Sequence, residues 1–330
     1  MKQWGRRIFG LSLLLMVSTS GCGMKETEVS VAAPDYDRSF VKQEAFASEP
    51  GKAASELTGI SQEYCIPNKE NKRNSSDEPV VLLYRIDEPD VLAEADATVQ
   101  LFPASVTKLL TAYTAWRHAD LSETVKFSYQ ASHVNISGAM LCGFQEGDSL
   151  SLRDLLSAML LFSGNDAAIA VAEHVSGSTA AFAELMNAEL RTLGGMHSNF
   201  VNPHGLHDKN HYTTAYDMYL VLNEMLKNEE FLSILKQNSV TVYYTDASGV
   251  QKSKTFQNTN LFLTKEKEIP ENIVILGGKT GTTNSAGCCL VQAFSTKAGK
   301  TYIAEVFGAK DYDRLYQKMY ELMLMAAENE

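Results

Sequence analysis

A serine and a lysine lie three positions apart in the stretch LFPASVTKLLTAYTAW, residues 101–116. Positions three apart share one face of a helix, so the side chains of Ser105 and Lys108 can touch. A serine hydroxyl is a poor nucleophile until a base removes its proton. A lysine can be that base only when it is neutral, a state that burial and nearby positive charge favour by lowering its pKa. The pair therefore has the residue types for covalent catalysis by an activated serine.

The same stretch also has the features of an ordinary helix start. Pro103 stops the preceding structure, Ser105 can cap the helix that follows, and Lys108 can be a solvated charge. The Ser-x-x-Lys spacing occurs twice more, at Ser39 with Lys42 and at Ser233 with Lys236. For an isolated pair we therefore favour a cap and a surface lysine.

Two further motifs change that balance. Ser163-Gly164-Asn165 and Lys279-Thr280-Gly281 each occur once, in that order, downstream of Ser105. This set of three resembles the penicillin-binding protein and serine β-lactamase superfamily. From about Pro79 onward the chain is similar to the low-molecular-mass D-alanyl-D-alanine carboxypeptidases, serine peptidase family S11. The similar segments are FPASVTKLLTA, LLFSGNDAAIAVAEHVSGS, FVNPHGLHDKNHYTTAYDM, NTNLFL and GGKTGTTNSAGCCLV.

The resemblance implies a role for each motif residue. Ser105 is the nucleophile, Lys108 is its base, and Ser163 relays protons to the leaving amine. The implied substrate-binding residues are Asn165, Lys279, Thr280, Gly281 and Thr282. Of these, the asparagine binds the substrate's peptide. Lys279, together with the hydroxyls of Thr280 and of either Thr282 or Thr283, suits a terminal carboxylate. The backbone N–H groups of Ser105 and Thr282 form an oxyanion hole, and many relatives have a larger residue at the latter position.

Two local alternatives remain open. Asn165 or Asp166 can cap the helix AAIAVAEHV, which is compatible with a role in catalysis. Four residues have the types and spacing of metal ligands, HxxHDxxH: His204, His207, Asp208 and His211. An HExxH motif is absent and the segment matches a family loop with an Asn-Pro-His-Gly turn, so we favour solvated or hydrogen-bonded histidines in a turn. We expect neither a metal nor another cofactor.

Three activities share such a site and differ in what attacks the acyl-enzyme. A class A β-lactamase deacylates with a carboxylate in a Glu-x-x-x-Asn loop. The only similar spacing, Glu184 with Asn187, comes too soon after Asn165, and SNFVNPHG around residue 199 has no carboxylate. We therefore expect a carboxypeptidase that removes the terminal D-Ala from peptidoglycan stem pentapeptides and is inhibited by β-lactam antibiotics. The alternatives are a non-hydrolysing sensor of β-lactams or muropeptides, and a β-lactamase.

Hydrophobic periodicity predicts a sheet assembled from both ends of the domain. The expected strands are VVLLYRI, VTVYY, NIVIL, GCCLVQAF and KTYIAEVFGA, and VILGGKTGTT is expected at a sheet edge. The expected helices are 105–117, 152–161, 165–175, 179–193, 215–237 and a final one from about Asp311 to Ala327. With the resemblance, this order predicts an α/β (α+β) fold of the β-lactamase/transpeptidase type. Its antiparallel sheet is flanked by helices, and a mostly helical lobe adjoins it.

The first residues have the pattern of an export signal. Lys2, Arg6 and Arg7 precede a short apolar run, and STSGC resembles the cleavage site of a bacterial lipoprotein, with Cys22 as the lipidated residue. We predict a signal peptide over 1–21, a lipid-anchored tether over 22–78 and a catalytic domain over 79–330. The alternative is an ordinary secretory signal. Either places the mature chain outside the cytoplasm, and a lipid would attach it to the cell membrane.

Composition narrows the partners. The chain has 330 residues, 45% of them hydrophobic, and a formal net charge of −11. That charge argues against a nucleic-acid partner. Besides Cys22, the cysteines are Cys65, Cys142, Cys288 and Cys289, with no metal-binding spacing among them. Cys288 and Cys289 are adjacent in an expected strand and should point to opposite faces, so free, buried thiols are the simplest interpretation.

Overall fold

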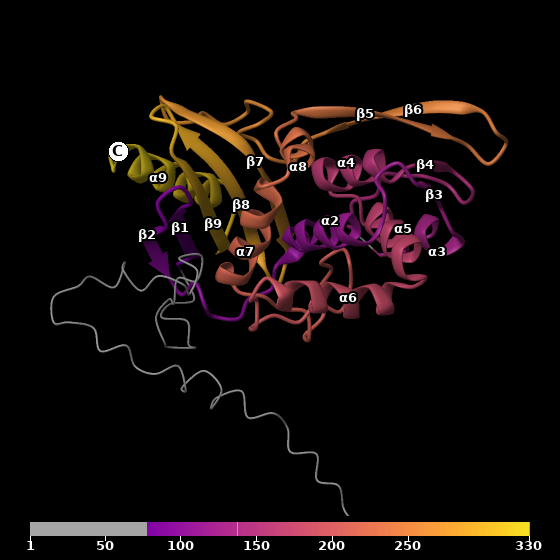
Figure 1. Ribbon diagram of the computed structural model, residues 1–330, viewed down its shortest axis with the longest axis horizontal. Helices are drawn as coiled ribbons and strands as arrows, with labels where there is room; N and C mark the ends of the chain where they lie inside the picture. The colour runs from indigo at the N-terminus through magenta and orange to yellow at the C-terminus, as the bar shows by residue number, and fades with distance from the viewer. Residues whose placement is uncertain (1–77, 137, 330) are drawn as a thin grey trace, which may run out of the picture. The chain divides into compact units, whose positions relative to one another are not determined.

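The computed structural model describes residues 78–136 and 138–329 (Figure 1). The predicted signal peptide, Cys22, Cys65 and all of the tether except Glu78 lie outside these residues. The described strands are β1 (Val80–Arg85), β2 (Asp90–Ala95), β3 (Thr124–Lys126), β4 (Ser149–Ser151), β5 (Ser239–Thr245), β6 (Gln251–Gln257), β7 (Ile273–Thr283), β8 (Gly287–Thr296) and β9 (Thr301–Ala309). The described helices are the 3-10 helix η2 (Ala104–Val106), α2 (Thr107–His118), α3 (Tyr129–Ser132), α4 (Leu152–Phe162), α5 (Asn165–Ser176), α6 (Thr179–Thr192), α7 (Ala215–Leu226), α8 (Glu229–Leu235) and α9 (Tyr312–Glu328).

The larger sheet joins the beginning and the end of the domain, as the sequence predicts. Its strand order is β2-β1-β9-β8-β7, and every neighbouring pair is antiparallel. The first strand pairs along its whole length with β9, from Val80 opposite Phe307 to Arg85 opposite Tyr302. Helices cover both faces, which explains why β8 and β9 are almost continuously apolar. β7 forms one edge of this sheet.

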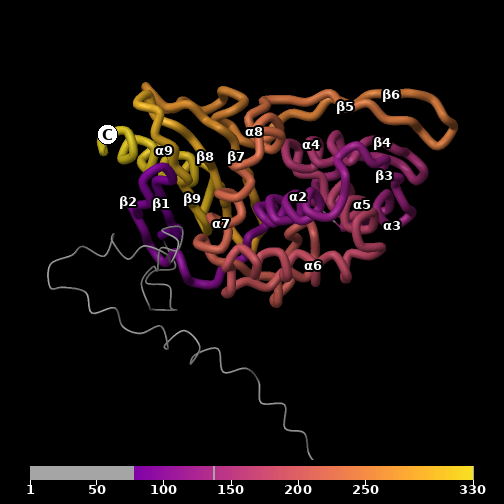
Figure 2. Tube along the Cα trace, viewed as in Figure 1, coloured from indigo at the N-terminus to yellow at the C-terminus, as the bar shows by residue number. Residues whose placement is uncertain are grey.

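The two faces of the sheet belong to different apolar clusters. On one face, α9 packs an apolar stripe, including Leu315 and Met319, against β8 and β9. On the other face lie α7 and then the helical lobe (Figure 2). Cys288 belongs to the α9 side and Cys289 to the opposite side, as strand alternation predicts. Cys142, Cys288 and Cys289 are buried and free, which confirms the prediction for these three.

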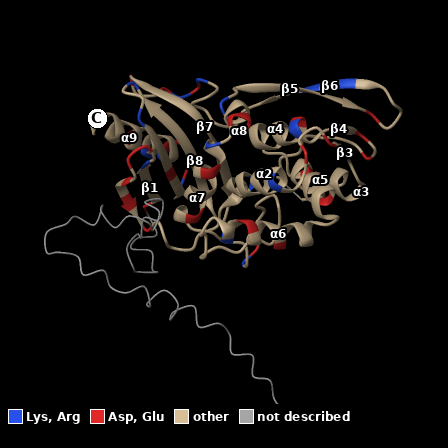
Figure 3. Cartoon of the chain, in the orientation of Figure 1, with Lys and Arg blue, Asp and Glu red and all other residues tan. Residues whose placement is uncertain are grey.

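A second, four-stranded sheet was not predicted. Its order is β3-β4-β5-β6, and the β5–β6 hairpin extends along α4 (Figure 1). The sequence of β6, QKSKTFQ, buries only Phe256, so it carries no hydrophobic signal for a strand. Its lysines contribute to the blue stretch at β6 in Figure 3. β2, β3, β4 and α3 were also missed, and the last three have only three or four residues each.

The predicted helix 215–237 is wrong in one respect, because it is two helices. α7 ends at Leu226, and α8 begins at Glu229. Asn228 caps α8 by accepting hydrogen bonds from the backbone N–H groups of Glu230 and Phe231. A local side-chain bond of this kind competes with a continuous helix and breaks it.

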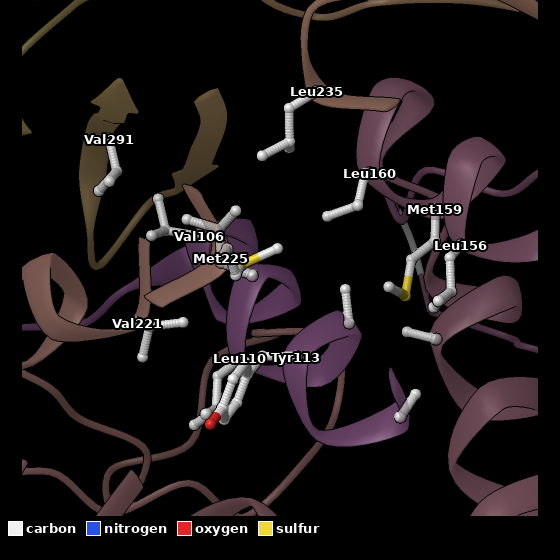
Figure 4. Close-up of a cluster of buried hydrophobic side chains, with 14 of the residues drawn as sticks. Val106, Leu110, Tyr113, Leu156, Met159, Leu160, Val221, Met225, Leu235 and Val291 are labelled. Atoms are coloured by element: carbon white, nitrogen blue, oxygen red, sulfur yellow. The ribbon is translucent and has the colours of Figure 1, made fainter. Parts of the chain in front are cut away.

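α2 lies at the centre of the helical lobe. All its residues from Thr107 to Ala115 are buried. Figure 4 shows the apolar cluster around its first turns, with side chains from α4, α7, α8 and β8. The labelled residues are Val106, Leu110, Tyr113, Leu156, Met159, Leu160, Val221, Met225, Leu235 and Val291. Because interiors are close-packed, this surrounding fixes η2, which leads into α2, against β7.

Candidate active site

Ser105 lies in η2, one turn before the buried part of α2. Pro103 is the N-cap of η2 and Val106 that of α2, and neither cap has a side-chain hydrogen bond. The interpretation of Ser105 as a helix cap is therefore wrong. Ala104 has φ 47°, a left-handed conformation that is uncommon outside glycine. Such backbone strain is maintained only where the surroundings determine it, and here it lies beside the serine.

Lys108 is fully buried and makes three polar contacts. Its Nζ lies 3.0 Å from Ser105 Oγ, 2.8 Å from Asn165 Oδ1 and 2.7 Å from the carbonyl oxygen of His204. Burial, and then the positive charge of Lys279, hold the pKa of Lys108 well below its ordinary value. The structure thus confirms the expected cause and direction of that shift.

These contacts determine how a neutral lysine would be oriented. A neutral amine has two N–H donors and one lone pair. The amide oxygen of Asn165 and the carbonyl of His204 can only accept, so they take the two hydrogens. The lone pair is then left for the hydroxyl proton of Ser105. The geometry therefore directs the lone pair of a neutral Lys108 at the hydroxyl of Ser105.

The second motif joins two helices. Ser163 is the C-cap of α4 and is buried and left-handed with φ 71°, and Gly164 is the N-cap of α5. A Cβ at Gly164 would lie 2.3 Å from Cys142 Sγ, so only glycine fits there. The expectation that Asn165 or Asp166 caps α5 is wrong, because Asn165 points to Lys108 and Gly164 takes the cap position.

The third motif lies on β7 and packs against η2. A Cβ at Gly281 would lie 2.9 Å from the backbone nitrogen of Ser105, so the glycine permits the close approach. Lys279 is buried, and burial lowers its pKa to about 7. The hydroxyl of Thr280 is 2.6 Å from that of Thr259.

Tyr312 was missed by the sequence reasoning. The hydroxyl of this residue, the first of α9, lies 2.9 Å from that of Thr282. Nothing in the spacing of the chain signals that contact, because it joins residues from two elements across the sheet edge.

The histidine segment is bound to α2 by hydrogen bonds. The Val201 backbone N–H donates to His211 Nδ1, so Nε2 carries the proton and donates to Thr107 Oγ1 at 2.8 Å. Thr111 donates to the Pro203 carbonyl at 2.6 Å. Burial lowers the pKa of His204 to about 3. No group of three or more possible ligand side chains is assembled for a metal within residues 78–136 and 138–329.

The three motifs thus meet at one place. Ser105, Lys108 and Asn165 are joined by hydrogen bonds, and Gly281 packs on the backbone of Ser105. The charge of Lys279 contributes to the lowered pKa of Lys108. Residues 74–311 match the family described as D-alanyl-D-alanine carboxypeptidase, peptidase family S11. The chain belongs to this family.

Individual proteins similar to this S11 member are consistent with that family assignment. It is 33% identical over 272 residues to the D-alanyl-D-alanine carboxypeptidase DacF of Bacillus subtilis, covering 80% of this chain and 61% of the relative. It is 30% identical to DacC of Escherichia coli, covering 67% of this chain and 54% of the relative. The chain thus spans little more than half the length of these curated relatives. Among solved structures, the Streptomyces K15 DD-transpeptidase matches with 25% identity and a TM-score of 0.69, covering 77% of this chain and 98% of that one. The expected fold class is confirmed.

Proposed function

We propose that the chain is a serine D-alanyl-D-alanine carboxypeptidase that removes the terminal D-Ala from peptidoglycan stem pentapeptides. The observation that carries the proposal is the contact between Lys108 Nζ and Ser105 Oγ, made by a lysine whose pKa is held low. Membership of the S11 family supports the substrate class.

In the proposed reaction, Lys108 takes the proton of Ser105 as its Oγ attacks the carbonyl between the two D-alanines. The negative charge on the tetrahedral intermediate is stabilised by the backbone N–H groups of Ser105 and Thr282. Lys108 gives this proton to Ser163 as Ser163 gives its own to the leaving amine, and D-Ala departs. Water then hydrolyses the ester on Ser105 and regenerates the hydroxyl.

Substrate binding is assigned to the residues around this centre. The side chain of Asn165 is held by Lys108 and can present its amide N–H to the substrate's peptide. The outer edge of β7 can pair with the substrate as an added strand. Lys279, Thr280 and Thr282 bind the terminal carboxylate, the lysine when it is charged.

The β-lactamase alternative has no support at the carboxylate considered for it. Glu184 is exposed on α6, and the nearby Asn187 binds the backbone of Phe200 instead. A β-lactam should therefore acylate Ser105, and the resulting acyl-enzyme should be hydrolysed slowly. A sensor that never turns over remains the second candidate, and turnover is what separates it from an enzyme.

The test is release of D-alanine from a pentapeptide ending in D-Ala-D-Ala, together with labelling by a fluorescent penicillin. Ser105→Ala should abolish both. Ser233→Ala is the matched control, because Ser233 has the same spacing to Lys236 but donates to the Glu230 carbonyl on α8. Stoichiometric labelling of the wild type without any release of D-alanine would establish the sensor instead.

We also propose export and attachment to the outer face of the cell membrane through lipid on Cys22. The support is the STSGC sequence behind a short apolar run. No described helix is long and apolar enough to cross a membrane. A bacterial lipoprotein carries more than one acyl chain, and two chains anchor a protein stably. Cys22→Ser should release the protein from the membrane fraction into the medium, and continued retention would contradict the proposal.

A further inference from the structure

The loop between α3 and β4 is attached to the second motif by backbone hydrogen bonds. The carbonyl of Met140 accepts from the backbone N–H of Asn165 at 2.8 Å. The buried carboxylate of Asp166 accepts from the N–H groups of Cys142 at 2.8 Å and Gly143 at 2.7 Å. It also accepts from the N–H of Ala167, in its own helix, at 2.9 Å. Loop and helix start are therefore one hydrogen-bonded unit.

A lysine from the second sheet holds the same loop from its other side. Lys254 of β6 donates to the carbonyl of Cys142 at 3.1 Å and to that of Gly143. Its Nζ lies 4.7 Å from the centre of the Phe144 ring and 5.6 Å from that of Tyr244. The aromatic faces favour the charged amine at this position.

One peptide group connects the two charges. The C=O of the Cys142–Gly143 peptide faces Lys254, and the N–H of the same peptide faces Asp166. A peptide dipole between a cation and an anion strengthens both hydrogen bonds, because each polarises the other. Burial raises the pKa of Asp166 from its ordinary value, and the three backbone N–H groups and then the charge of Lys254 oppose that rise.

The chain of contacts continues to the nucleophile. Asp166 follows Asn165 directly, the backbone of Asn165 is held by Met140, and its side chain accepts from Lys108. Lys254, at the far end of this chain, has no contact with Ser105, Lys108 or Asn165 among its described hydrogen bonds. Any effect of Lys254 on the reaction must therefore pass through the loop and Asp166.

We propose that Lys254 is a positioning residue for the active site, acting through the Cys142–Gly143 peptide and Asp166 to fix Asn165 and hence the orientation of Lys108 toward Ser105. The proposal rests on the proposed function, because it explains how the same reaction is set up. It also gives the β5–β6 hairpin a role in the chemistry of a site that it does not line.

The test compares two lysines on one face of one strand. Lys254→Met removes the charge that binds the loop. Lys252→Met removes an equal charge two residues away, where Lys252 instead pairs with Asp246 at 2.6 Å. The full chain is used for each variant. The measurements are the acylation rate of Ser105 by a fluorescent penicillin, kcat and KM for release of D-alanine from a D-Ala-D-Ala pentapeptide, and the thermal unfolding midpoint.

We expect Lys254→Met to lower the acylation rate and kcat/KM about tenfold, with the larger change in kcat, as for loss of one charge-assisted hydrogen bond. The acylation rate and kcat/KM of Lys252→Met should stay within about twofold of the wild-type values. Lys254→Arg, which can donate to both carbonyls, should restore most of the rate. The two methionine variants should unfold at similar temperatures.

Equal kinetics for Lys254→Met and Lys252→Met would overturn the proposal. So would a loss of rate that arginine does not rescue and that follows a lower unfolding temperature only in Lys254→Met, because the role would then be structural. A wild type that is labelled by penicillin but releases no D-alanine would refute the proposed function alone. The acylation rates would still decide the role of Lys254.

Discussion

At the scale of single residues, two buried lysines have different tasks. In the proposed reaction, Lys108 touches Ser105 and must be neutral to act as its base, whereas Lys279 must be charged to bind the substrate's carboxylate. A positive charge on one lysine disfavours a positive charge on the other, and Lys279 is among the causes that lower the pKa of Lys108. Two titratable groups in one site with opposed requirements give a bell-shaped pH profile.

The profile of kcat/KM should rise as Lys108 loses its proton and fall as Lys279, with a pKa of about 7, loses its own. In the enzyme–substrate complex, the substrate carboxylate favours the charged form of Lys279 and raises its pKa. The falling limb of kcat should therefore lie at higher pH than that of kcat/KM. D-alanine release measured from about pH 5 to about pH 9 gives both limbs. Coincident limbs would contradict the assignment of Lys279.

At the scale of elements, the site forms where η2 and β7 meet. Sequence could predict this meeting, because the three motifs and their long flanks identify their family. It could not predict Tyr312 beside Thr282 or Lys254 beside Cys142, since Tyr312 and Lys254 belong to α9 and β6, which carry no motif. The same lack of signal hid β6, whose sequence has the composition of a loop.

The contact between η2 and β7 depends on the absence of a side chain at Gly281. In Gly281→Ala, the new Cβ would meet the backbone nitrogens of Ser105 at 2.9 Å and Val106 at 3.0 Å, and the carbonyl of Pro103 at 3.0 Å. The strand must move away from the serine by a few tenths of an ångström or more. A displacement approaching 1 Å lowers rates about 100-fold, and we expect penicillin acylation to fall by roughly 10- to 100-fold.

Gly177→Ala is the control for this substitution. Gly177 ends α5 with φ 74° and has open space where a Cβ would be added. Gly177→Ala should lower the free energy of unfolding by about 1 kcal/mol and leave the acylation rate unchanged. Equal acylation rates for the two variants would show that β7 tolerates the added methyl group.

At the scale of the whole described domain, the larger sheet is the common support. It carries the third motif on β7 and separates α9 from α7 and the helical lobe. The sequence predicted this arrangement from the apolar strands at both ends of the domain. Glu305 lies at the centre of β9 and interrupts an otherwise apolar run that is buried on both faces. Nothing in the sequence explains why a carboxyl group is placed there.

Glu305 should make stability depend on pH. It is fully buried, and neither carboxyl oxygen has a hydrogen-bond partner within the described residues. Burial, and then the charge of Asp217, raise the pKa of Glu305 well above 4.5, its ordinary value. Above about pH 4.5 the unfolded state loses this proton while the folded state keeps it, so the folded state binds more protons and stability falls as pH rises.

Glu305→Gln removes that dependence, because an amide stays neutral at every pH. Relative to wild type, the variant should gain stability in urea unfolding between about pH 5 and about pH 8. The matched substitution Glu184→Gln, at an exposed position of α6, should keep the wild-type dependence. A difference between Glu305→Gln and wild type that is the same at both pH values would mean that Glu305 is ionised in the folded state. A buried, unpaired charge would then have to be stabilised by water or by a shift of Asp217.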